Sequence, residues 1–222
     1  MLVKRLEHLL SMKKPAPKKP DGRLENSDLT KAALRAAGRR MFGELGYDAS
    51  PVGALCAEAK VTTGALYHHF GDKKGLFAAV AEELDRNLVL LAAGVTGKVH
   101  SRGGSVWDAF LASVDALLEA GVDPHGRRIG LTDAPAVLGA DAWIAIRERH
   151  GLGAMVGAVQ ALQAAGVFGQ GDPRRLARLI LGLLYGAIEA LPDGGVNIER
   201  ALADTKVLVH TMLKSLRCDA AG

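Results

Sequence analysis

The chain has 222 residues, with 28 Lys and Arg, 24 Asp and Glu, a formal net charge of +4 and 49% hydrophobic residues. This length and composition allow one or two packed domains and exclude an intrinsically disordered protein. Two cysteines exclude a disulfide framework, and charges inside the N-terminal apolar patch predict no secretory signal. No stretch is apolar enough to predict a membrane span, so we expect a soluble cytoplasmic protein.

The charge is divided unevenly along the chain. Residues 1–80 contain 14 Lys and Arg against 8 Asp and Glu, a net of +6, whereas residues 81–222 contain 14 against 16, a net of −2. The Lys/Pro run at 12–20 cannot continue a helix. We therefore predict that residues 1–26 are a disordered basic leader, with a DNA-contacting arm as the alternative. Met12 is an alternative start of the chain.

Helical periodicity begins at Ser27 and predicts an all-α fold, because no segment shows the alternation of a strand. Ser27 or Asp28 can cap the first helix, which glycines end near residue 46. Ser50-Pro51 is typical of an N-cap followed by a first-turn proline, and predicts a short second helix. Thr62 can cap a third helix that ends at Phe70.

The rest of the chain repeats the helical pattern in longer segments. Asp72 can cap a long amphipathic helix, and Asp172-Pro173 opens another strong one. The predicted helices are 73–93, 106–117, 143–162, 173–191 and 196–216, with a Pro-interrupted stretch at 124–138.

The two short helices around Val61-Thr62 form a helix-turn-helix pattern with the helix before them. A recognition helix must be capped and small near its N-terminus to enter the major groove. Thr62-Thr63-Gly64-Ala65 supplies two hydroxyls and two residues of little bulk. Tyr67 and His68 can face outward and reach phosphates or base edges. The pattern therefore predicts a DNA-binding unit.

These residues carry a family resemblance. Segment 28–84 resembles the DNA-binding domain of tetracycline-repressor-like (TetR family) regulators, and the remainder resembles their helical ligand-binding and dimerisation domain, with a weaker match at 133–139. The resemblance implies a helix-turn-helix domain at 27–75 and a second domain at 76–222. The stretches that match are 42–47, 50–52, 61–70, Lys73 and Leu76-Phe77.

The resemblance implies a homodimeric transcriptional regulator, usually a repressor that a small-molecule effector releases from a palindromic operator in double-stranded DNA. Lys60 and Cys56 depart from the family pattern, which often has Gly and Ala there. A left-handed Lys60 would cost about 1 kcal/mol relative to Gly. By resemblance, Ser50, Tyr67 and Lys73 contact phosphates, and Thr62, Thr63, Gly64 and His68 belong to the groove-facing surface.

The second domain contains two sets of candidate residues. Bulky side chains on its central helices are candidates for the wall of an apolar ligand cavity, with core packing as the alternative: Trp107, Phe110, Trp143, Met155 and Tyr185. Apolar stripes on the last two helices are either core or, as the resemblance implies, a four-helix dimer interface: Leu176, Ile180, Leu183, Leu184, Leu202, Val209 and Met212.

No pattern predicts a cofactor, a metal site or catalysis. Adjacent helical residues such as His68 and His69 point about 100° apart, which disfavours a shared metal ion. No spacing predicts a nucleophile with its base, so we expect no enzyme. Two other functions stay open: a sequence-nonspecific DNA-binding protein that uses the basic leader, and a helical ligand-binding protein with a vestigial DNA-binding unit.

Overall fold

The structure is a computed structural model that describes residues 22–193, 195 and 197–218, and this part of the chain is helical. Its β pairing is limited to one isolated bridge between Phe168 and Arg217. No helix within these bounds is long and apolar enough to cross a membrane. The predicted all-α fold is confirmed. The elements are α2 (Gly22–Leu45), α3 (Val52–Glu58), α4 (Thr63–Phe70), α5 (Lys73–Ser101), α6 (Val106–Ala120), α7 (Pro124–Arg127), η1 (Arg128–Asp133), α8 (Ala134–Leu138), α9 (Ala140–Arg147), η2 (Glu148–Leu152), α10 (Gly153–Ala164), α11 (Pro173–Glu189) and α12 (Ile198–Lys214).

The first helix starts earlier than the sequence predicts. α2 begins at Gly22, so neither Ser27 nor Asp28 is its cap. The reason is local, because no proline lies between Gly22 and Ser27 to stop the helix from extending past the predicted caps. The rest of the predicted leader, including Met12, lies outside the described residues.

Side-chain caps set the starts of the next helices. The Thr62 hydroxyl accepts a hydrogen bond from the Ala65 N–H at 3.3 Å, and Asp72 accepts one from the Gly75 N–H at 2.7 Å. Both predicted caps are confirmed. The predicted cap at Ser50 is wrong, because Pro51 is the N-cap residue of α3.

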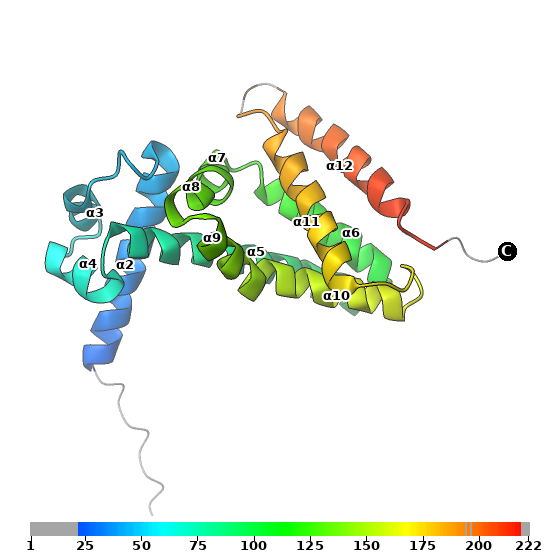
Figure 1. Cartoon of the computed structure of the whole chain (residues 1–222), viewed down its shortest axis with the longest axis horizontal. Coiled ribbons are helices and arrows are strands. Elements are labelled where there is room, and N and C mark those ends of the chain that lie inside the picture. The colour runs from blue at the N-terminus through cyan, green and yellow to red at the C-terminus, as the bar shows by residue number, and fades with distance from the viewer. Residues whose placement is uncertain (1–21, 194, 196, 219–222) are drawn as a thin grey trace, which may run out of the picture.

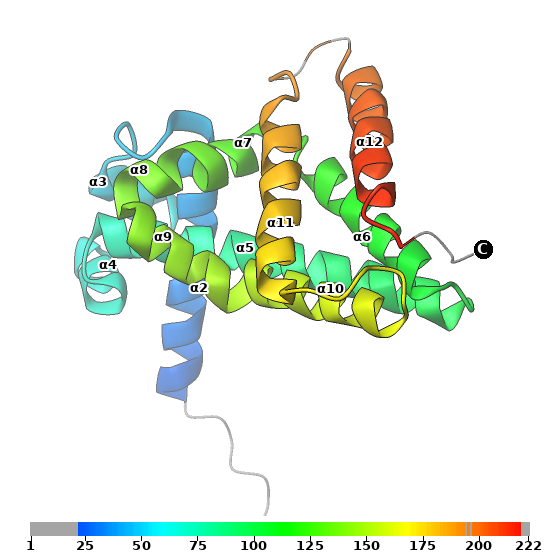
Figure 2. The same ribbon diagram turned by 45° about the vertical axis from the view of Figure 1, so that its right-hand side comes forward.

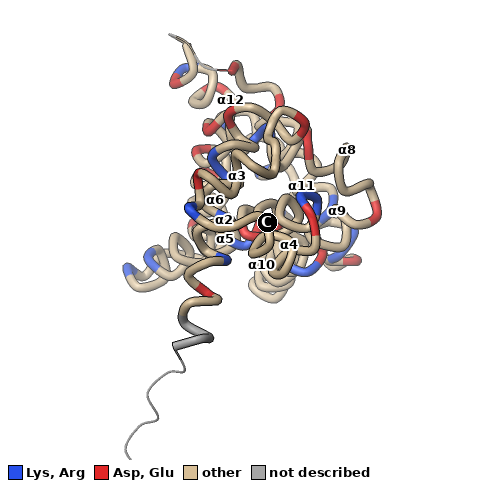
Figure 3. The backbone as a smooth tube through the Cα atoms, turned by 90° about the vertical axis from the view of Figure 1, so that its left-hand side faces the viewer, with Lys and Arg blue, Asp and Glu red and all other residues tan. Residues whose placement is uncertain are grey.

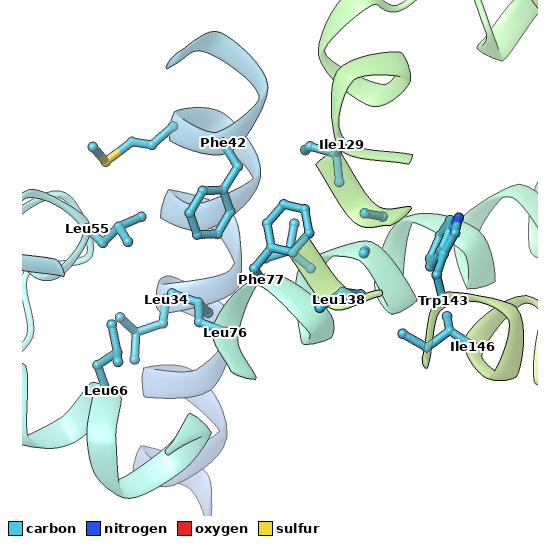
Figure 4. Close-up of a cluster of buried hydrophobic side chains, with 14 of the residues drawn as sticks. Leu34, Phe42, Leu55, Leu66, Leu76, Phe77, Ile129, Leu138, Trp143 and Ile146 are labelled. Atoms are coloured by element: carbon cyan, nitrogen blue, oxygen red, sulfur yellow. The ribbon is translucent and has the colours of Figure 1, made fainter. Parts of the chain in front are cut away.

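One hydrophobic core holds the helix-turn-helix together, and it extends beyond residue 75. Leu34, Leu55 and Leu66 bring one buried side chain each from α2, α3 and α4 (Figure 4). Phe77 of α5 packs edge-on against Phe42 with ring centroids 5.1 Å apart. Residues of η1, α8 and α9 complete the same core: Ile129, Ala134, Leu138, Trp143 and Ile146. The expected boundary at 75–76 therefore does not divide the packing.

A second core lies among α6, α10, α11 and α12. The 29-residue helix α5 runs from the helix-turn-helix toward this second core, as Figures 1 and 2 show. At 1.5 Å per residue it is roughly 43 Å long. A single rigid element therefore joins the two functional regions that the sequence predicts.

Two consecutive arginines, Arg127 at the end of α7 and Arg128 at the start of η1, hold the ends of two distant helices. Arg128 donates to the Glu44 carbonyl at 2.6 Å and to the Gly43 carbonyl at 3.3 Å, at the C-terminus of α2. Arg127 donates to the Leu191 carbonyl at 2.7 Å, just beyond α11. Cations at helix C-termini satisfy free carbonyls and complement the helix dipole. This arginine pair links the helix-turn-helix to the C-terminal helices.

Candidate nucleic-acid interface and ligand cavity

The turn between α3 and α4 follows a Schellman pattern. The Val61 N–H donates to the Cys56 carbonyl at 3.0 Å, and the Lys60 N–H donates to the Ala57 carbonyl at 3.1 Å. Lys60 has a φ of 55°, the left-handed conformation that this motif requires. Cys56, the other departure from the family pattern, is buried in the first core. The departure at Lys60 therefore leaves the turn intact.

The helix α4 presents a small, polar face to solvent. Leu66 is fully buried and anchors the helix, whereas Tyr67 is 52% exposed. Thr62, Thr63, Gly64 and His68 are also exposed, on the turn or on the helix itself. These side chains lie where a major groove or a phosphate could reach them. Five of the seven residues expected to contact DNA are thus exposed, and all five lie on α4 or at its N-cap, Thr62.

Ser50 is a correction to the expected phosphate contacts. Its side chain is fully buried, and its hydroxyl donates to the Gly46 carbonyl at 2.8 Å. This hydrogen bond closes the loop between α2 and α3. The hydroxyl stabilises that loop and does not face solvent.

Lys73 is also engaged inside the protein. Its ammonium donates to the Tyr47 carbonyl at 2.9 Å and lies 4.1 Å from the centroid of the Tyr47 ring. Desolvation by burial is the main cause that raises the pKa of Tyr47. Lys74 is the exposed cation of this helix turn. The sequence contains both lysines but does not show which one folds inward.

The charge around α4 is mixed rather than strongly basic. Seen from the end that carries α2, α3 and α4, Lys and Arg positions are interspersed with Asp and Glu positions (Figure 3). Arg40, for example, pairs with Glu58 at 2.7 Å and with Glu44 at 2.9 Å. The missed cations near the recognition surface are Lys60 and Lys74, both exposed. A mixed charge of this kind gives a weaker long-range attraction to phosphates than a uniformly basic surface would.

The two adjacent histidines of α4 differ in environment. His68 is exposed and His69 is half-buried, with ring centroids 4.9 Å apart. Desolvation by burial, followed by the neighbouring His68, lowers the pKa of His69. Within the described part of the chain, no group of three or more His, Cys, Asp or Glu could hold a metal ion.

Two cavities lie beside α5, between the two cores. The larger has a volume of about 520 Å³ and the smaller about 210 Å³. Phe110 and Met155 line the larger cavity, Trp143 lines the smaller, and Tyr185 lines both. Trp107 is a correction, because it lines neither cavity and packs against Phe110 and Phe168 at 5.9 and 6.0 Å between ring centroids.

Asp85 lies where the two cavities meet, and the sequence-based set of candidates omits it. Its side chain is only 8% exposed, and one oxygen accepts a hydrogen bond from the Gly151 N–H of η2 at 3.1 Å. Desolvation by burial raises the pKa of the Asp85 carboxyl. Its position four residues after Ala81 and three before Leu88 is the signal that places it on the inward face of α5.

The C-terminal stripes divide differently from the expected dimer interface. Ile180, Leu184 and Val209 are buried in the second core and are therefore corrections. Leu176, Leu183 and Leu202 are half-buried against that core, and Met212 is 52% exposed. The exposed apolar face of α11 and α12, called here the C-terminal face, consists of Leu179, Val207, Leu208 and Met212, which are 67%, 66%, 62% and 52% exposed.

Comparison with known proteins matches both halves of the chain. Residues 34–80 match the model described as bacterial regulatory proteins, tetR family, and residues 107–212 match the tetracyclin repressor-like C-terminal domain. Among curated relatives, the transposon Tn10 TetC protein of Escherichia coli is 30% identical over 115 residues, covering 52% of this chain and 56% of that protein. The transcriptional repressor AcnR of Corynebacterium jeikeium is 29% identical over 108 residues, covering 46% of this chain and 57% of that protein. The chain thus spans little more than half the length of these relatives.

A solved structure matches nearly the whole fold. The TetR-family transcriptional regulator from Pectobacterium atrosepticum superposes with a TM-score of 0.70 at 34% identity. The alignment covers 88% of this chain and 97% of that one. Together with the two family matches, this shows that the chain belongs to the TetR family of bacterial regulatory proteins.

Proposed function

We propose that this protein is a DNA-binding transcriptional regulator, a homodimeric repressor that binds a palindromic operator and is released by a small-molecule effector. The observation that carries the proposal is the Thr62-capped helix α4. It buries Leu66 and exposes Thr63, Gly64, Tyr67 and His68. A short helix with a small exposed N-terminal turn suits the major groove.

A dimer is needed for the operator geometry. Two recognition helices of a dimer occupy successive major grooves about 34–36 Å apart, which matches a near-palindromic site. The C-terminal face supplies exposed apolar surface on two neighbouring helices, and burial of such side chains drives association. We place the partner subunit on this face, so that α11 and α12 of the two copies form the interface.

The effector acts by population shift in this proposal. A ligand in the cavities beside α5 must bind the released state more tightly than the DNA-bound state. The coupling route consists of α5 itself and the arginine pair at Arg127 and Arg128. Arg127 lines the smaller cavity, and Arg128 holds the end of α2. A ligand that moves η1 therefore shifts the helix-turn-helix.

A gel-shift with DNA from upstream of the protein's own gene tests the proposal. We expect a band that is sensitive to salt and prefers one sequence. Tyr67→Ala should weaken binding to all sequences, because a phosphate contact carries no sequence information. Thr63→Ala should mainly change which sequence is preferred. Thr132→Ala, which is exposed in η1 outside the helix-turn-helix, is the matched control.

Two results would contradict the proposal. Binding that is equally strong on unrelated DNA would indicate a sequence-nonspecific protein. Unchanged binding in both the Tyr67 and Thr63 variants would show that α4 is not the recognition helix.

A further inference from the structure

The larger cavity, called the channel here, is partly open to solvent and has a mostly apolar lining. It runs beside α5 from Asp85 to His100, which at 1.5 Å per residue is roughly 22 Å. Alanines and glycines of α5 and α10 leave the space open: Ala92, Ala93, Gly97, Ala154, Gly157 and Ala158. A mostly apolar lining spread over this length suits an extended hydrocarbon.

Asp85 is the one carboxylate, lysine or arginine side chain among the described residues that line this channel. Asp85 as a residue is 8% exposed and forms no ion pair within the described part of the chain. The Gly151 N–H donates to Oδ2, and Oδ1 accepts no hydrogen bond from the residues described. A carboxylate has about four acceptor positions, so most of its capacity is unused.

Burial is the largest influence on the pKa of Asp85 and raises it, whereas the charges of Arg147 and His150 act in the opposite direction. Arg147 stacks 3.5 Å from the centroid of the Tyr185 ring, and its Nε donates to the Tyr185 hydroxyl at 3.2 Å. Arg147 lines the smaller cavity but not the larger one. The channel lining therefore offers an anionic ligand the Asp85 carboxylate and no Lys or Arg side chain. A cationic ligand would meet a partly desolvated carboxylate that forms no direct ion pair among the described residues.

We propose that the channel binds an extended apolar molecule carrying one protonated amine, with the ammonium on Asp85 and the hydrocarbon between α5 and α10. The ammonium would donate to Oδ1, and burial of the hydrocarbon would supply most of the remaining affinity. Burial raises the pKa of Asp85, and a bound ammonium would offset that effect by favouring the ionised carboxylate. The inference rests on the proposed function, because it assigns the effector to this cavity.

The test compares three probes of equal length on the full chain by isothermal titration calorimetry: decylamine, decanol and decanoate, each below its micelle concentration. We expect decylamine to bind about tenfold more tightly than the other two, because a desolvated charged hydrogen bond exceeds a neutral one. Asp85→Asn should remove this preference and leave decanol binding unchanged. Asp141→Asn, on an exposed aspartate outside both cavities, should behave as the unchanged protein.

A second variant tests the position of the hydrocarbon. Nothing lies within 4 Å of a Cβ built on Gly157, so Gly157→Leu can occupy the channel without a backbone clash. It should weaken binding of all three probes about tenfold. Unchanged binding in Gly157→Leu would overturn the placement between α5 and α10.

The remaining outcomes overturn the proposal. Tighter binding of decanoate than of decylamine would reverse the expected charge preference and point to Arg147. Equal affinity for all three probes would leave no role for the carboxylate. If no probe binds while specific DNA binding persists, the ligand class fails and the regulator stands. If decylamine binds through Asp85 but does not release DNA, the site stands and the effector role in the proposed function fails.

Discussion

Replacement of Lys60 by glycine tests whether backbone strain is stored in the helix-turn-helix. Lys60 holds a φ of 55° at the C′ position of the Schellman motif that ends α3. A side chain with a Cβ in this conformation costs about 1–2 kcal/mol. Glycine relieves that strain but loses about 0.4–1 kcal/mol through the greater entropy of the unfolded chain. We therefore expect Lys60→Gly to raise the free energy of unfolding by about 1 kcal/mol.

The assay is urea unfolding followed by circular dichroism at a fixed protein concentration, since the proposed dimer would make stability concentration-dependent. Lys60→Ala is the matched control, because it removes the same exposed charge but keeps a Cβ in the left-handed region. We expect the alanine variant to be as stable as the unchanged chain. In thermal unfolding, the glycine variant should melt roughly 2–4 °C higher than the alanine variant.

Equal stability of the glycine and alanine variants would refute the strain argument. A gain shared by both variants would instead indicate that the lysine charge destabilises the fold. Both variants remove one exposed cation beside α4, so their loss of sequence-independent DNA affinity should be the same. A larger loss for glycine alone would show that the stiffness of this turn contributes to DNA binding.

Three further predictions concern the cavity, the domain link and the dimer. Asp85→Asn should stabilise the ligand-free protein in thermal melts near neutral pH. Burial raises the pKa of the Asp85 carboxyl in the folded state above its value in the unfolded chain. The stability that the protonated carboxyl preserves is fully present below the unfolded pKa and is lost as pH rises through the folded pKa. The variant's advantage should therefore vanish in acid. Arg128→Ala should cost about 1–3 kcal/mol in urea unfolding and reduce ligand-driven DNA release, because the Glu44 carbonyl loses its donor; unchanged release would remove Arg128 from the coupling route. Leu208→Glu should give a monomer in analytical ultracentrifugation, whereas Leu90→Glu, at an equally exposed leucine of α5 (62%), should remain a dimer; a dimer in both would place the interface elsewhere.

Helix order and the caps at Thr62 and Asp72 are predictable from the sequence because their signals are local. Thr62 and Asp72 cap helices through bonds to N–H groups three residues later, and no distant residue is needed for that geometry. The start of α11 is predictable in the same way, because Pro173 occupies its first turn directly after the N-cap Asp172. The family resemblance over 28–84 also rests on local features, because the residues that carry it are short stretches of the helix-turn-helix.

The direction of a side chain on a helix is harder to predict, because neighbouring residues differ by about 100° and distant elements decide which one is buried. Lys73 turns toward the loop carbonyl of Tyr47, whereas Lys74 stays exposed. On α11, Ile180 enters the core and Leu179 stays outside at 67% exposure. Both errors are displacements by one residue, and both depend on contacts far away in sequence.

Asp85 is hard to predict for a different reason, because a charged residue occupies an inward position where a hydrophobic one is expected. The apolar periodicity of α5 predicts an inward position at residue 85, and hydrophobicity alone predicts a leucine or an alanine there. A buried carboxylate with one backbone partner is unfavourable for the ligand-free fold. Sequences that specify one fold agree across local and tertiary levels, and departures concentrate at functional positions. Asp85 is therefore the residue of the second domain where a stability cost and a ligand-binding role are expected to coincide, and its variant separates the two by raising the melting temperature while removing amine preference.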